Sequence, residues 1–190
     1  MKLNIPNALT LFRIFLIPVF VLVYYFPFPW GSILAASVFV LAGFTDWLDG
    51  YLARVLNQAS AFGAFLDPVA DKLMVAVALV LLVSDRNLHY IAVPAAVIIG
   101  REIAISALRE WMADVGKKTS VSVSFLGKVK TAIQMLAIVL LLACNPLRAG
   151  ILLFAGYVAL YIAALLTLWS MIIYLRAAWV ELVIKPKNLT

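Results

Sequence analysis

The sequence is poor in charged residues and in cysteine, and each shortage excludes a class of protein. Only 13% of the 190 residues are charged, whereas 66% are hydrophobic and the mean hydropathy is +1.09. A chain of this composition cannot be an ordinary soluble protein. Its single cysteine, Cys144, excludes an intramolecular disulfide and leaves the redox compartment open. We therefore expect one membrane-embedded domain over residues 1–190, without an internal repeat.

Negative charge is also scarce, because nine Asp and Glu face fifteen Lys and Arg, for a net charge of +6. In a membrane protein this excess is explained by topology and by contact with anionic membrane lipids, so no nucleic acid partner is expected. Residues 1–10 are short, mixed and proline-containing, which favours a segment at the membrane surface. No small-residue cleavage site follows them, and we expect the first hydrophobic segment to be retained.

The lengths of the hydrophobic runs predict an all-α polytopic membrane protein with six transmembrane helices. The uncharged run from Ser32 to Thr45 has 14 residues, whereas a crossing needs roughly 20. The second helix must therefore continue through two aspartates to about Arg54, and by the same argument the third must begin near Phe62. The six crossings are predicted near residues 11–26, 32–54, 62–83, 90–111, 125–142 and 150–178.

Six crossings return both termini to one side of the membrane. Assigning that side to the cytosol places 13 of the 15 Lys and Arg there, and leaves only Arg86 and Arg148 outside. Because positive charge gathers on the cytosolic side, the termini and the charged ends of the second and third helices are predicted to face the cytosol.

Four aspartates lie at those charged ends. Asp46 and Asp49 are three residues apart on the second helix, and Asp67 and Asp71 are four apart on the third, so each pair shares a helix face. Four carboxylates in a partly dry site either hold protons or gather cations. An all-aspartate shell suits a hard ion, Mg²⁺ or Mn²⁺, and four ligands suffice for the two-metal sites of phosphoryl transfer.

The pattern around these aspartates resembles the signature of the CDP-alcohol phosphotransferases without a departure. It reads Asp46-x₂-Asp49-Gly50-x₂-Ala53-Arg54-x₈-Gly63-x₃-Asp67-x₃-Asp71. The resemblance implies that the donor is a CDP-linked lipid, that metals held by the four aspartates bind its pyrophosphate, and that CMP leaves. It also implies that Asp71 is the general base and that the enzyme is a homodimer. The remaining implied CDP-binding residues are Gly50, Ala53, Arg54 and Gly63, together with Asp46, Asp49 and Asp67.

Asn7, Thr10 and Arg13 recur at helical spacing on one side of the first crossing. From the residues alone, helix capping and a positive-inside anchor explain them. Members of the family carry a similar Asn-x₂-Thr-x₂-Arg element near the nucleotide site, which implies that Asn7 contacts the cytidine or a phosphate of CDP.

Basic residues on the fourth and fifth helices indicate the acceptor. Paired cations and bidentate arginine suit a phosphate dianion, although ion pairs of Arg101 and of Glu102 with neighbouring residues are an equally good structural explanation. Gly100-Arg-Glu-Ile, Ala107-Leu-Arg-Glu-Trp111 and Gly127-Lys-x-Lys-Thr131 resemble the branch of the family that makes phosphatidylglycerophosphate in the bacterial cytoplasmic membrane. This resemblance implies CDP-diacylglycerol as donor and sn-glycerol 3-phosphate as acceptor. The predicted acceptor-phosphate residues are Arg101, Arg109, Lys128, Lys130 and Thr131.

Two other functions fit parts of the sequence. A sister enzyme that uses inositol phosphate or phosphatidylglycerol would keep all four aspartates and differ only in the basic residues. A cation or proton transporter would use ionisable groups inside the membrane, but it would spread them across the bilayer rather than gather them at one side. A purely helix-packing subunit leaves the four aspartates unexplained.

Overall fold

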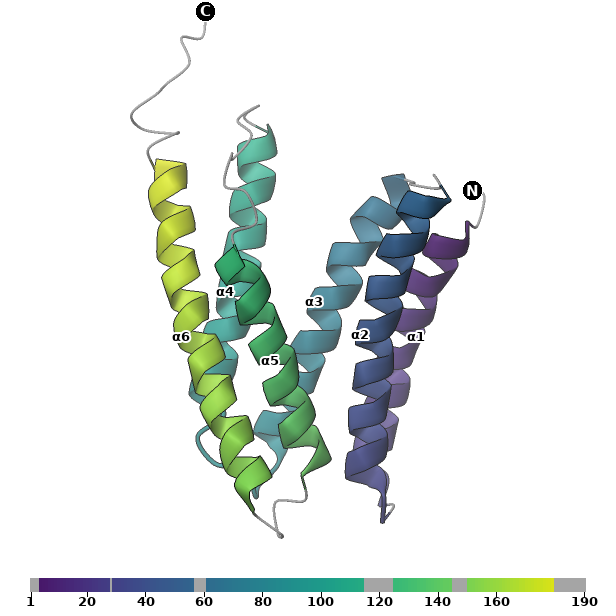
Figure 1. Cartoon of the computed structure of the whole chain (residues 1–190), viewed down its shortest axis with the longest axis vertical. Helices are drawn as coiled ribbons and strands as arrows, with labels where there is room; N and C mark the ends of the chain where they lie inside the picture. Colours follow the sequence, from purple (N-terminus) through teal and green to yellow (C-terminus); the bar gives the residue numbers. More distant parts are fainter. Residues whose placement is uncertain (1–3, 28, 57–60, 115–124, 145–149, 180–190) are drawn as a thin grey trace, which may run out of the picture. The chain divides into compact units, whose positions relative to one another are not determined.

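In a computed structural model of the chain, the described residues are 4–27, 29–56, 61–114, 125–144 and 150–179, and their regular elements are all α-helices (Figure 1). The helices are α1 (Ile5–Tyr25), α2 (Gly31–Val55), α3 (Ala61–Ser84), α4 (Ala92–Asp114), α5 (Phe125–Ala143) and α6 (Ile151–Trp179). The all-α architecture is thereby confirmed.

Three of these helices are long and apolar enough to cross a membrane within the described residues. They span Ile5–Tyr25, Gly31–Val55 and Ile151–Arg176. The protein is therefore a helical membrane protein, as predicted. The crossing of the bilayer by helices α3, α4 and α5 stays a prediction.

Helix α1 begins earlier than the sequence analysis expected. It starts at Ile5, with a proline in its first turn, whereas the crossing was predicted from Leu11. Proline is tolerated in the first turn because the N–H groups there have no partner within the helix. Asn7 and Thr10 consequently belong to the helix, and both are buried.

Helix α4 continues past its predicted end. The sequence predicts that the crossing ends near residue 111 and that a polar loop runs from Met112 to Ser124, but α4 extends to Asp114 and the side chain of Met112 is fully buried. The prediction was wrong at this boundary because polar residues beyond Met112 suggested a loop, whereas burial of its apolar side chain favours the helix. The rest of the predicted loop lies outside the described residues.

The chain divides into two compact units. Unit 1 comprises Met1–His89 and Ile138–Gly156, and unit 2 comprises Tyr90–Ala137 and Tyr157–Thr190. Helices α5 and α6 each contribute to both units. The single domain over residues 1–190 remains a prediction.

In unit 1, α1 packs against both α2 and α3 (Figure 1). Phe20 of α1 and Phe39 of α2 are fully buried, with ring centroids 6.2 Å apart. Near the C-terminal end of α1, the hydroxyl of Tyr24 donates a hydrogen bond of 3.0 Å to the carbonyl oxygen of Leu81 in α3. Helices α1 and α3 therefore run in the same direction, and α2 runs opposite to both.

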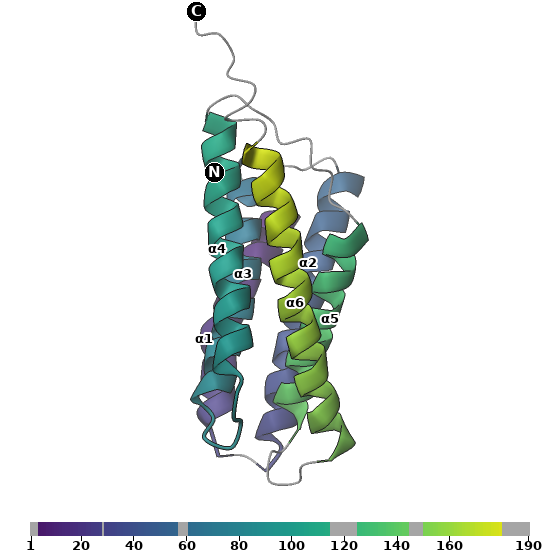
Figure 2. The same cartoon turned by 90° about the vertical axis from the view of Figure 1, so that its left-hand side faces the viewer.

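Unit 2 is built from α4 and from parts of α5 and α6, with α4 and α6 lying side by side in Figure 2. Its buried apolar residues include Ile98 and Ile105 of α4 and Leu160 and Ala163 of α6. Several buried polar side chains lie among them, which is the arrangement expected of a functional site inside a membrane protein.

Candidate active site

One face of α1 is polar and almost completely buried. Asn7, Thr10 and Arg13, spaced by three residues, are 5%, 0% and 1% exposed. The guanidinium of Arg13 forms ion pairs with two aspartates of α2, one terminal nitrogen contacting Asp46 and the other Asp49. The i, i+3 spacing of the aspartates places both carboxylates on the face of α2 that meets α1.

The same face of α1 contacts an aspartate of α3. The hydroxyl of Thr10 donates a hydrogen bond of 2.5 Å to Oδ1 of Asp67. Thr10 and Arg13 lie one helical turn apart, so α1 contacts the acidic residues of α2 and of α3 at nearly the same level. Three of the four predicted aspartates thus surround one polar face of unit 1.

The four aspartates differ in their access to solvent or ligand. The side chain of Asp49 is 3% exposed and that of Asp46 is 43% exposed. Asp67 is half-buried and Asp71 is exposed. The acidic site therefore has a closed side at Asp49 and an open side at Asp46 and Asp71.

Of the small residues of the predicted CDP site, Gly50 has open space beside it. Apart from its chain neighbours and the nearby backbone of its own helix, no described atom lies within 4 Å of where a Cβ on Gly50 would stand. Ala53 is half-buried and Gly63 is buried. The exposed Arg54 donates from Nε to the carbonyl oxygen of Gly50 in its own helix, at 2.9 Å. Its guanidinium is held against the glycine.

The chemistry of the aspartates fits a hard divalent cation, although in this structure the carboxylates do not converge on a single metal position. Within the described part of the chain, no three His, Cys, Asp or Glu side chains come together as a metal site. Carboxylate oxygens alone are the donors that Mg²⁺ and Mn²⁺ prefer. The guanidinium of Arg13, paired with Asp46 and Asp49, marks a place where positive charge is favourable.

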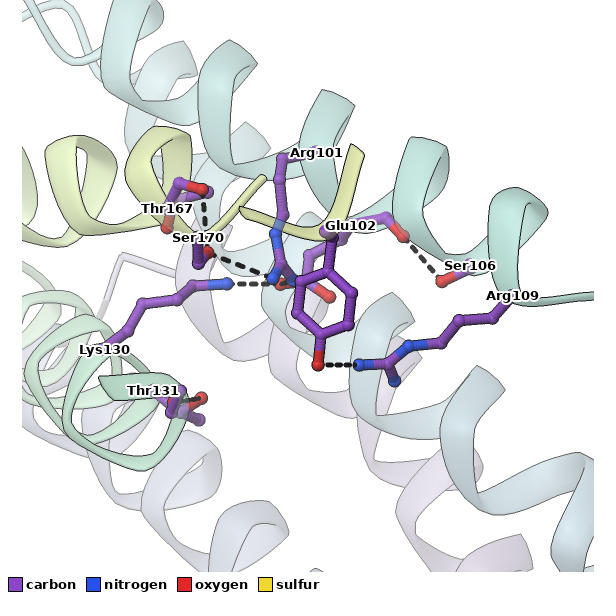
Figure 3. A network of polar contacts seen from close by, with 10 residues as sticks. Arg101, Glu102, Ser106, Arg109, Lys130, Thr131, Thr167 and Ser170 are labelled. Atoms are coloured by element: carbon purple, nitrogen blue, oxygen red, sulfur yellow. Dashed lines mark hydrogen bonds and ion pairs between the residues drawn. The ribbon is translucent and has the colours of Figure 1, made fainter. Parts of the chain in front are cut away.

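A second group of charged residues lies in unit 2, centred on Glu102 of α4. Oε1 of Glu102 accepts a hydrogen bond of 2.7 Å from Nζ of Lys130 in α5 and lies 3.1 Å from NH1 of Arg101. Figure 3 shows these three side chains pointing toward one another. Lys130 has a side chain only 4% exposed, and a buried ammonium needs such a partner because desolvation is costly.

Helix α6 completes this basic cluster with two polar residues. NH2 of Arg101 donates to the hydroxyl of Ser170 at 3.1 Å, and NH2 of Arg109 donates to the hydroxyl of Tyr174 at 2.7 Å (Figure 3). Both guanidinium groups also lie over the ring of Tyr174, 5.7 Å and 5.0 Å from its centroid. Arg101 and Lys130 contact the carboxylate of Glu102, and Arg109 joins them through Tyr174, so the basic cluster holds three cations and one carboxylate.

Two of the predicted acceptor residues, Thr131 and Lys128, have no hydrogen bond or ion pair with the basic cluster among the residues that the structure describes. The hydroxyl of Thr131 donates to the carbonyl oxygen of Gly127 in its own helix at 3.0 Å, and Lys128 is exposed. The structure therefore brings together Arg101, Arg109 and Lys130 and leaves Thr131 bonded within α5.

Sequence reasoning missed the side chains that hold both clusters in place. From the residues alone it gave Thr10 and Arg13 a capping or anchoring role, and the family resemblance placed their element near the nucleotide site without naming the aspartates as their partners. It did not single out Ser170 and Tyr174, whose spacing of four residues in an apolar helix indicates one polar face. The role of Glu102 as the partner of a lysine on another helix had no signal in the sequence.

Apolar helices that enclose a cluster of aspartates and a separate cluster of cations define a polytopic membrane protein with polar sites inside it. The chain belongs to the CDP-alcohol phosphatidyltransferase family, whose sequence model matches residues 3–180. The resemblance in the aspartate signature is thereby confirmed, and the protein is a phosphatidyltransferase.

Several bacterial relatives are similar over nearly their whole length. A protein of Sodalis glossinidius is 58% identical over 179 residues, which cover 94% of this chain and 96% of that protein. A protein of Yersinia enterocolitica is 56% identical, covering 96% and 98%, and one of Pectobacterium atrosepticum is 58% identical, covering 94% and 96%. All three are named CDP-diacylglycerol–glycerol-3-phosphate 3-phosphatidyltransferase.

Proposed function

We propose that the protein transfers the phosphatidyl group of CDP-diacylglycerol to sn-glycerol 3-phosphate, giving phosphatidylglycerophosphate and CMP. The observation that carries this proposal is the excess of positive charge around Glu102, in a family whose members share the aspartate signature. An acceptor that is itself a phosphate ester needs such a cluster of cations, whereas a neutral alcohol does not. The names of the relatives agree with this acceptor.

The donor would bind to unit 1. Asp46, Asp49, Asp67 and Asp71 would hold Mg²⁺ or Mn²⁺, in a site for two ions. When bound, the metal would neutralise the pyrophosphate of CDP-diacylglycerol and stabilise the charge that develops on the departing CMP. The cytidine and the phosphates would lie along the open side, against Gly50, Ala53, Arg54 and Gly63, with Asn7 as a further contact.

Asp71 would act as the general base. It is exposed, and a soluble acceptor can therefore reach its carboxylate. It would take the proton of the acceptor hydroxyl, whose oxygen then attacks the lipid-side phosphorus. The new P–O bond forms as the bond to CMP breaks, and CMP leaves with the electron pair.

The phosphate of the acceptor would bind to the basic cluster in unit 2. Arg101 and Arg109 each donate a hydrogen bond to a hydroxyl of α6, those of Ser170 and Tyr174, and a guanidinium suits bidentate contact with phosphate oxygens. Lys130 supplies a buried positive charge behind them. Lys128 and Thr131 would contribute at the exposed edge of this site.

We also propose that residues 1–190 act as one catalytic domain in the bacterial cytoplasmic membrane, that the protein is a homodimer, and that both termini and the active site face the cytosol. The charge asymmetry of the loops supports this orientation, because 13 of the 15 Lys and Arg fall on the side that holds the aspartates. The bacterial origin of the relatives supports the location.

The test is CMP release from protein purified in detergent, given CDP-diacylglycerol and Mg²⁺ or Mn²⁺. Glycerol 3-phosphate, inositol 1-phosphate and phosphatidylglycerol are supplied one at a time. We expect release with glycerol 3-phosphate alone and its loss in Asp71→Asn. Asp85→Asn, in the turn after α3, is the matched control and keeps full activity.

Each other outcome points to a different function. CMP release with inositol 1-phosphate would keep the enzyme class and the phosphate-binding role of the basic cluster but refute the acceptor. Release with phosphatidylglycerol would also refute that role. No release with any acceptor, in protein with the expected helical circular dichroism, would refute the proposed reaction and favour the transport of cations or protons.

A further inference from the structure

Arg13 occupies a position that the proposed chemistry does not use. It comes from α1, its side chain is 2% exposed, and its two terminal nitrogens each pair with a different carboxylate of α2. Its remaining nitrogen, Nε, is buried and has no hydrogen-bond partner among the described residues. One cation thus offsets the charge of Asp46 and Asp49 and leaves a net charge of −1 on the three groups.

This pairing competes with the binding of a metal ion by the same carboxylates. The guanidinium stays protonated at any physiological pH, so it cannot make room by losing its charge. A divalent ion close to it would be repelled, and each N–H bond occupies one of the about four lone-pair sites of a carboxylate. Metal binding at these aspartates is therefore favoured when Arg13 gives up part of its contacts.

The exposures of the two carboxylates indicate which contact is given up. The side chain of Asp49 is 3% exposed, and it has little room to turn away from Arg13. The side chain of Asp46 is 43% exposed and faces the open side of the cluster. Asp46 is the carboxylate that can exchange a partner within the protein for one that arrives from outside.

We propose that Arg13 is a positioning residue that serves as the internal cation of the metal-free acidic site, and that metal binding moves Asp46 from Arg13 to the metal while Asp49 keeps its contact. The inference rests on the proposed function, because it takes Asp46 and Asp49 as metal ligands. In the metal-free protein, Arg13 keeps two like charges together in an apolar bundle.

Removing the charge of Arg13 should have two opposite effects. Arg13→Gln leaves two carboxylates facing each other, so the metal-free protein becomes less stable. The same change frees both carboxylates and removes a repelling cation, so the divalent ion binds more tightly. If Arg13 had only a structural role, its loss would lower both the stability of the fold and the affinity for the metal.

The experiment measures Mn²⁺ affinity and thermal unfolding in detergent without substrates. Bound Mn²⁺ is followed by the loss of the EPR signal of the free ion, and unfolding is followed with EDTA and with saturating Mn²⁺. We expect Arg13→Gln to bind Mn²⁺ at least about tenfold more tightly than the wild type. We also expect a lower Tm in EDTA and a larger rise in Tm on adding Mn²⁺. Arg176→Gln, an exposed arginine of α6, controls for the loss of one positive charge.

A second variant keeps the test valid if Arg13→Gln does not fold. Arg13→Lys retains the charge, but its single ammonium pairs well with only one carboxylate. We expect its Mn²⁺ affinity to lie between those of the wild type and of Arg13→Gln. Mn²⁺ affinity that stays equal or falls in both variants, with helical circular dichroism intact, overturns the inference.

Failure of the inference is distinguishable from failure of the proposed function. If the wild type binds Mn²⁺, Asp46→Asn weakens that binding and the Arg13 variants do not strengthen it, only the role of Arg13 is refuted. If the wild type binds no Mn²⁺, or Asp46→Asn binds it as well as the wild type does, the proposed metal site is refuted and the inference with it.

Discussion

The hydroxyl of Thr10 in α1 donates a hydrogen bond of 2.5 Å to the carboxylate of Asp67 in α3. Thr10 is fully buried and Asp67 is half-buried, so the bond orients an aspartate at the edge of the acidic site. Charge-assisted hydrogen bonds of this kind are stronger than neutral ones.

Thr10→Val should remove this bond with little change in side-chain volume. We expect the protein to lose about 1–2 kcal/mol of stability, because Asp67 loses a partner in a partly dry site, and we expect CMP release to slow several-fold. Thermal unfolding and CMP release measure the two effects. Ser37→Ala removes a hydroxyl that donates to its own helix at 2.8 Å and should change neither quantity. Full activity in Thr10→Val would show that Asp67 keeps its functional orientation without the hydrogen bond from α1.

Glu102→Gln should destabilise unit 2. The change leaves the buried ammonium of Lys130 without a carboxylate, and losing one partner of a buried pair costs up to about 3 kcal/mol. The double variant Glu102→Gln/Lys130→Met should recover part of the loss, since it also removes the unpaired charge. Thermal unfolding measures both variants against Glu110→Gln, an exposed control on the same helix. Equal stability of all three variants would contradict a structural role for the pair.

Tyr174→Phe should weaken the binding of the acceptor and leave the binding of the donor unchanged. It removes the hydroxyl that holds Arg109 but keeps the ring beneath both guanidinium groups. We expect the KM for glycerol 3-phosphate to rise several-fold, with kcat and the KM for CDP-diacylglycerol nearly unchanged, because the basic cluster binds the acceptor phosphate. Tyr174→Leu should raise this KM further. The matched control is Tyr161→Phe, which removes a hydroxyl bonded to the carbonyl oxygen of Tyr90 at 2.8 Å. An equal change in both KM values would place Tyr174 outside acceptor binding.

Gly156→Ala should loosen the contact between α5 and α6 in unit 1. A Cβ at this position would stand 2.9 Å from Cδ2 of Leu141 and 3.3 Å from Cβ of Leu140, so a side chain would have to shift. Overpacking of this kind costs about 1–3 kcal/mol. Thermal unfolding should show the loss in Gly156→Ala and none in Gly100→Ala, where the described residues leave open space around the new methyl group. A stable Gly156→Ala would mean that Leu141 has room to move.

The class of protein and the positions of the aspartates along the helices could both be predicted from the amino-acid sequence. Runs of apolar residues too short to cross a bilayer forced two helices to continue through Asp46, Asp49, Asp67 and Asp71, and the structure has α2 and α3 over those residues. This part was predictable because the thickness of the bilayer sets how many residues a crossing needs, and the residues of each apolar run can be counted along the chain.

The pairing of the charges, in contrast, depends on how the helices pack. Helical spacing places Arg13 on a face of α1 and Lys130 on a face of α5, but it does not say which neighbouring helix that face meets. Arg13 meets two aspartates and Lys130 meets Glu102, so the first cation lies in the acidic site and the second has a partner inside the basic one. The energy of a charge in a membrane protein depends on its neighbours in space and on its desolvation, and both are fixed only when the helices pack.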